Sequence, residues 1–138
     1  MEVHNETKTH KIQLELVDSE MQNLPSIQVY LTFETPTLKY SNQSIWLTIQ
    51  DLDTFQNSVE ELLNNNTGTT NLKSMSPGEL DLKIENKDNL GNFIMSLNCS
   101  QITDLSTNFK QSISTQFEVQ GYSLKQIITG ISELKNVC

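Results

Sequence analysis

The side chains best suited to acid–base chemistry are carboxylates, and they crowd into one third of the chain. The set consists of Asp51, Asp53, Glu60, Glu61, Glu79, Asp81, Glu85 and Asp88. General acid–base catalysis needs two groups whose pKa values are pushed apart, which requires burial of at least one. These carboxylates fall at positions expected to point outward, where they stay solvated and keep ordinary acidity. We therefore expect no enzyme.

Other chemically active side chains are few. His4 and His10 are the only histidines, and both precede the first expected strand, so a metal site built on them competes with two solvated side chains. Cys99 is predicted to be a small core residue, and a structural pair with Cys138 is not favoured. The chain has no CxxC pair, GxSxG elbow, phosphate loop or HExxH helix. We expect no cofactor and no metal.

The composition bears on partners and location. The net charge is −8, the isoelectric point is near 4.6, and all nine cationic residues are lysine. A chain without arginine lacks the planar guanidinium group that binds phosphates through two parallel hydrogen bonds. We therefore expect neither direct nucleic-acid binding nor binding to an anionic membrane. No apolar run suits a signal peptide or a membrane span, which makes the cytoplasm the expected location. The acidic face is either merely solvated or attracts a basic protein, nucleases being one class.

Two stretches change from a strand period to a helix period, and the chain is organised around them. In Ser44–Asn64, alternation through Ile45 and Leu47 gives way to a helical stripe, and Ser114–Asn136 repeats this design. The stripes are Leu52, Phe55, Val59 and Leu62, and then Leu124, Ile127, Ile131 and Leu134. Each helix must fold back over the apolar face of a sheet.

Capping signals mark where the two helices begin. Asp51 is predicted to cap the first helix, whereas Ser123 with Gln126 forms a capping box for the second, and Tyr122 with Ile127 forms a hydrophobic staple. The shared design suggests a duplication, with three strands and a helix in each half. The alternative is that two amphipathic helices match by chance.

Alternating apolar residues predict the strands. These are Lys8–Asp18 (with Ile12, Leu14 and Leu16 inward), Ser26–Glu34, Ser44–Gln50, Glu79–Glu85, Asn92–Cys99 and Phe109–Val119. Short connections favour antiparallel pairing of neighbours in sequence. We predict an α+β fold: two mostly antiparallel meanders of six or seven strands in all, with two amphipathic helices packed on the sheet.

The length favours a single domain, residues 1–138. We expect an N-terminal tail (1–7), a first half of strands and helix (8–64), a polar linker (65–78) and a second such half (79–138). Leu72 and Met75 are the only anchors in the linker, and Gln101–Thr107 is expected to be a loop.

Several punctuating residues resemble a known family. The chain resembles the pattern of the WapI-type bacterial immunity proteins in four stretches. These are an acidic turn with Leu52-x-x-Phe55, then SMSPGELDLKI, DNLGNFIMSLN and FEVQGYSLKQIITGISEL. The resemblance covers roughly Ser44 to Leu134. It implies a cytoplasmic protein that binds and neutralises a cognate polymorphic toxin, typically a nuclease domain, without catalytic residues. The chain departs from the family pattern in its first strands, where more aromatic residues are expected; Trp46 is its only tryptophan. This departure leaves the identity of the partner open.

A binding surface would draw on outward residues. Glu79, Asp81 and Glu85 are expected to present carboxylates about every 7 Å along a strand, and Trp46 is the natural aromatic anchor unless a helix or loop covers its face. The full expected set is Trp46, Asp53, Glu60, Glu61, Glu79, Asp81 and Glu85. The alternative function is a non-catalytic structural or adaptor module of a larger bacterial assembly.

Overall fold

The computed structural model describes residues 1–104 and 106–136, in which four strands followed by a helix occur twice. The first half contains β1 (Glu2–His4), β2 (Lys11–Glu20), β3 (Ser26–Thr35), β4 (Leu38–Thr48) and α1 (Ile49–Asn65). The second contains β5 (Thr69–Lys73), β6 (Asp81–Asn86), β7 (Asn92–Asp104), β8 (Phe109–Gln120) and α2 (Gly121–Lys135). The α+β prediction is confirmed, with one strand more in each half than the proposed repeat had.

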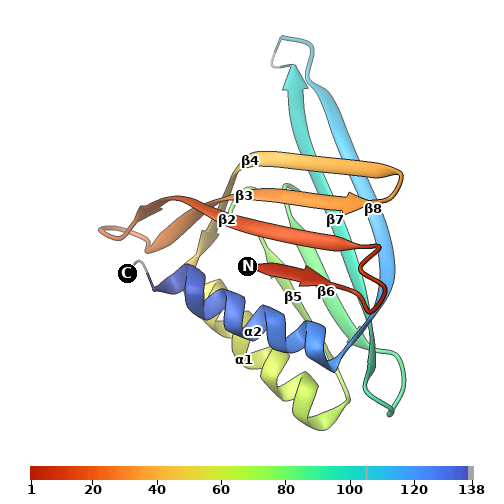
Figure 1. Ribbon diagram of the computed structural model, residues 1–138. Helices are drawn as coiled ribbons and strands as arrows, with labels where there is room; N and C mark the ends of the chain where they lie inside the picture. The colour runs from red at the N-terminus through yellow and green to blue at the C-terminus, as the bar shows by residue number, and fades with distance from the viewer. Residues whose placement is uncertain (105, 137–138) are drawn as a thin grey trace.

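Each half forms its own four-stranded antiparallel sheet, ordered β1-β2-β3-β4 and β5-β6-β7-β8. The strands of the first sheet cross in front of those of the second, and the two helices lie side by side below β1 (Figure 1). Phe33 of β3 and Phe117 of β8 stack with ring centroids 6.0 Å apart, so the apolar faces of the two sheets meet in one core.

The helices tie the halves together, because each packs beside the edge strand of the other half: α1 beside β5, and α2 beside β1. They run antiparallel, so that Asp53 near the start of α1 pairs with Lys135 at the end of α2. Between them the buried Gln56 side chain donates to the Ile128 carbonyl at 2.8 Å and to Ser132 Oγ at 2.7 Å. Its oxygen accepts from Lys135 Nζ at 2.8 Å.

The periodic positions are buried as the sequence predicts. All eight residues of the two helical stripes are at most 5% exposed. The inward residues of β3, β6 and β7 are buried as well, and Cys99 is a core residue at 3% exposure. Leu16 is an exception at 38% exposure; it lies just before a bulge, between Leu16 and Asp18, that shifts the register of β2 against β3. A pair between Cys99 and Cys138 lies outside the described residues.

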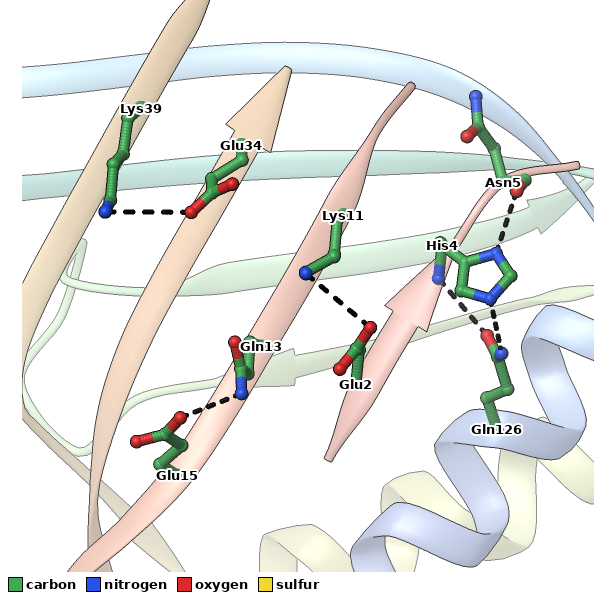
Figure 2. A network of polar contacts seen from close by, with 9 residues as sticks. All are labelled: Glu2, His4, Asn5, Lys11, Gln13, Glu15, Glu34, Lys39 and Gln126. Carbon is green, nitrogen blue, oxygen red and sulfur yellow. Dashed lines mark hydrogen bonds and ion pairs between the residues drawn. The ribbon is translucent and has the colours of Figure 1, made fainter. Parts of the chain in front are cut away.

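The predicted cap Asp51 and the predicted capping box of Ser123 with Gln126 are both wrong. Thr48 is the N-cap of α1, and its Oγ accepts from the amide of Asp51, which lies in the first turn. The α2 helix begins after Gln120 without a side-chain cap. Ser123 Oγ instead donates to the His4 carbonyl at 2.7 Å. Gln126 Oε1 accepts from the His4 amide at 3.2 Å, as Figure 2 shows. The supposed capping box fastens β1 to α2.

Strands also occupy three segments that were expected to be irregular. Within the expected tail, β1 pairs with β2 and buries Val3; within the expected linker, β5 pairs with β6 and buries Leu72. The expected loop Gln101–Thr107 is strand as far as Asp104, because β7 continues there alongside β8. Short polar strands such as these gain their order from a neighbouring strand, which local sequence does not show.

Gln56 offers a test of the helix contact. Gln56→Ala removes two donated hydrogen bonds from a buried site, so we expect the free energy of unfolding to fall by about 1–2 kcal/mol in urea titrations. The control is Asn57→Ala on the exposed side of the same helix, which should change stability by less than about 0.5 kcal/mol. Equal effects of the two substitutions would contradict this role.

Substitution of Ser123 tests whether its hydroxyl group links β1 to α2 or caps the start of α2. In Ser123→Ala, hydrogen exchange should become faster in β1 and at the β2 amide of Leu14, which bonds to the Met1 carbonyl. The first turn of α2 should keep its protection, and Thr129→Ala, at an exposed position of the same helix, should change neither. Loss of protection confined to the start of α2 would instead indicate a cap.

Candidate interaction surface

The expected binding residues do not form one surface. Asp53, Glu60 and Glu61 lie on the exposed side of α1. Asp81 and Glu85 lie on the outer face of β6, and Glu79 precedes that strand. Trp46 is on the outer face of β4, opposite Gln28 of β3. The structure therefore divides the set into separate regions, which differ in charge.

The α1 helix is the most uniformly acidic of these regions. It carries Asp51, Asp53, Glu60 and Glu61, all exposed, and no lysine. Lys135 of α2 pairs with Asp53. Two further exposed carboxylates, Asp18 and Glu20, lie at the end of the β2–β3 hairpin.

The outer faces of both sheets are mixed in charge. On β6 Lys83 lies between Asp81 and Glu85, with its Nζ 3.9 Å from the Glu85 carboxylate, and Lys73 of β5 lies opposite Asp81. Asp81 and Glu85 thus point outward as expected, but lysines lie beside both of them. On the first sheet, shown in Figure 2, Lys11 and Lys39 are each 3.7 Å from a glutamate, Glu2 and Glu34 respectively. Such exposed pairs contribute little to stability but cancel the local field.

Glu79 lies in a small pocket of about 140 Å³ that is also lined by Gln101 and Lys110. Burial raises the pKa of its carboxyl group, so the expectation of ordinary acidity is wrong here. Trp46 is half-buried, and its carbonyl accepts from the amide of Met75 at 2.9 Å. The segment after β5 thus bonds to the free edge of β4 beside Trp46.

A cleft beside α1 contains residues that the sequence analysis did not single out. It has a volume of about 420 Å³, lies between the β2–β3 turn and the first turns of α1, and includes only Asp53 from the expected set. Leu24 on its wall is 49% exposed, and the amide of Ile49 donates to the Pro25 carbonyl at 2.9 Å. The cleft is lined by Leu24, Pro25, Ile49, Gln50, Asp53, Thr54 and Asn57. The signal available in the sequence was an apolar residue placed before a proline in a turn.

Both histidines belong to ordered structure. The His4 ring lies between the Asn5 carbonyl, at 2.9 Å, and the Gln126 side chain, at 3.0 Å (Figure 2). The His10 ring stacks on Phe117 with centroids 4.8 Å apart. The expectation that both precede the first strand in a tail is wrong.

In residues 1–104 and 106–136, no cluster of three or more His, Cys, Asp or Glu side chains is arranged to hold a metal ion. In the same residues, no helix has the length and apolar character to cross a bilayer.

The residues that carry the family resemblance are mainly structural. Leu52, Phe55 and Leu80 are core residues. Ser74 Oγ donates to the Ser76 carbonyl at 2.7 Å and accepts from the Leu80 amide at 2.9 Å, which shapes the turn before β6. Gly78 and Gly91 have φ of 85° and 84°, a conformation that favours glycine. These residues thus support the fold and do not form a binding surface. Searches against family models, curated proteins and solved structures found no match for this chain.

Two buried groups predict a loss of stability in alkali. Burial raises the pKa of the Cys99 thiol to about 12, and burial with the charge of Cys99 raises the pKa of the Tyr40 phenol to about 12. Unfolding returns both groups to lower pKa values, 9.0 and 10.0. Between about pH 9 and pH 12 the unfolded chain therefore binds fewer protons, and the free energy of unfolding falls as pH rises.

Urea titrations at a series of alkaline pH values measure this decline. Cys99→Ala and Tyr40→Phe should each make the decline shallower, because each removes one group that ionises only after unfolding. The same pH dependence in both variants as in the unaltered chain would show that other groups cause it.

Proposed function

We propose that this protein acts in the cytoplasm as an immunity protein, which binds and neutralises a bacterial toxin with a basic active domain, such as a nuclease. The observation that carries the proposal is the acidic helix α1, which presents four carboxylates and no lysine beside an open cleft with an apolar wall. The resemblance to WapI-type immunity proteins supports the same function. Neutralisation by occlusion requires a complementary surface and no catalytic group.

Charge on α1 suits the capture of a basic partner. A surface of one sign raises the association rate with an oppositely charged protein, and salt weakens the effect. The outer faces of the two sheets carry both lysines and carboxylates, many of them paired. Their electrostatic potential is therefore less negative than that of α1, because the opposite charges cancel. We therefore assign the main role to Glu60 and Glu61, which no described ion pair engages, with Asp53 at the edge of the cleft.

The cleft supplies what charge alone does not. Tight protein interfaces depend on a few apolar or aromatic side chains that enter pockets from which water is excluded. The wall formed by Leu24, Pro25 and Ile49 can receive such a side chain, while Asp53, half-exposed beside its partner Lys135, can accept a second bond from a lysine or arginine of the toxin. An apolar anchor flanked by basic residues is accordingly the segment we expect on the toxin.

Co-expression with the toxin encoded beside the gene tests the function. The unaltered protein should protect cells and co-purify with that toxin, and failure of both would refute the proposal. Glu60→Lys with Glu61→Lys should slow association by on the order of tenfold or more at low salt and weaken protection.

The matched control reverses the same number of charges on β6, in Asp81→Lys with Glu85→Lys, and should still protect. If the β6 variant fails while the α1 variant protects, the function stands but its surface is the outer face of the second sheet. Thermal unfolding of both variants checks that each is folded.

A further inference from the structure

The edges of the two sheets differ in how they are protected. An unpaired edge strand presents free amide and carbonyl groups to other chains, and folded proteins usually cover or interrupt such edges. Beside β1, α2 bonds to both the amide and the carbonyl of His4. Along β4, the carbonyls of Ser41 and Trp46 accept from Gln101 Nε2 and the Met75 amide. The five-residue β5 lies beside α1.

The fourth edge, β8, is left open. It is twelve residues long, it is the end strand of its sheet, and in the described part of the chain only β7 pairs with it. Residues 111–117, QSISTQF, contain no charge, proline or glycine. Among the first six residues of β8, Phe109–Ser114, only Ile113 is half-buried and the other five are exposed. Phe109 is 66% exposed. Figure 1 shows β7 and β8 extending beyond the first sheet as a two-stranded arm.

We propose that β8 pairs antiparallel with β8 of a second copy of this chain, joining the two second sheets across a twofold axis at Ser114. A twofold interface pairs the same segment with itself in reverse. With Ser114 opposite its own copy, Lys110 lies opposite Glu118 of the second copy, and both side chains are on the outer face with Ser112, Ser114 and Gln116. Glu118 also pairs with Lys87 of its own chain at 2.7 Å, so Lys110 of the second copy would join an existing exposed ion pair. This register alone brings the two charged residues of β8 into opposition.

The same register accounts for the exposed aromatic ring. Phe109 falls opposite Val119 of the second copy, which lies at the buried end of β8. The exposed arm of each copy thus lies along the core end of the other, where burial of the phenylalanine is favourable. We favour a second copy over a foreign strand, because the twofold register sets Lys110 opposite Glu118 at two places and Phe109 opposite Val119 at two places along the same pair of strands.

The pairing is independent of toxin binding. The acidic helix α1 packs beside β5, at the opposite edge of the sheet from β8. A dimer joined through β8 leaves α1 free in both copies and presents two acidic surfaces.

Sedimentation equilibrium of the purified chain tests the proposal and requires no toxin. The unaltered protein should reach twice the 15.7 kDa mass of one chain. Ser114→Lys places like charges directly opposite each other and should raise the dimer dissociation constant by about tenfold or more. The control Asn98→Lys adds the same charge to the same face on β7, opposite Ser114 but away from the edge, and should leave the dimer intact.

A charge exchange tests the register. Lys110→Glu should weaken the dimer, and Lys110→Glu combined with Glu118→Lys should restore it. Because Glu118→Lys also removes the pair with Lys87, Lys87→Glu is added to the double exchange so that the intrachain pair is kept. The proposal is overturned if the chain is a monomer at all concentrations. It is equally overturned if Ser114→Lys and Asn98→Lys have the same effect, or if the double exchange does not restore dimerisation.

Discussion

The contact between α1 and α2 is the interaction on which the rest of the structure depends. Each helix follows the sheet of its own half but packs beside the edge strand of the other half. The two sheets meet through their apolar faces, and the helix pair covers the core between β1 and β5. Separating the halves would expose both sheets at once, so the repeated units form one interlocked core. Gln56 adds directional bonds to this contact, which sets the relative position of the helices as well as their proximity.

This arrangement also distributes the surfaces. Because the helices protect β1 and β5, and side chains and loops of the second half bond to β4, β8 is the edge that remains open among residues 1–104 and 106–136. Because α1 buries its apolar stripe between the halves, its carboxylates all face solvent, and one of them, Asp53, borders the cleft formed with the β2–β3 turn. The acidic surface and the open edge are thus consequences of the same packing and lie on opposite sides of one sheet.

Periodicity alone was sufficient where a segment buries a regular apolar face. The stripes of both helices and the inward residues of β3, β6 and β7 are those that the sequence predicts, because burial of one face imposes a fixed spacing. It was insufficient for β1, β5 and the end of β7, whose residues are mostly polar and whose order comes from a paired strand. Local signals also misled at Ser123 and Gln126, since a hydroxyl and an amide suited to a cap are equally suited to a neighbouring strand.

For the surface, the sequence by itself determined which residues are charged, the excess of carboxylates and which segments carry them. Only the tertiary structure decided which carboxylates have lysines beside them, since Lys73 and Asp81 are brought together by strand register and Lys135 and Asp53 by helix packing. Electrostatic fields depend on distances in space between all charges, whereas a sequence lists only their order along the chain. The cleft at Leu24 and the open edge of β8 arise for the same reason, because both are defined by which distant segments lie beside them.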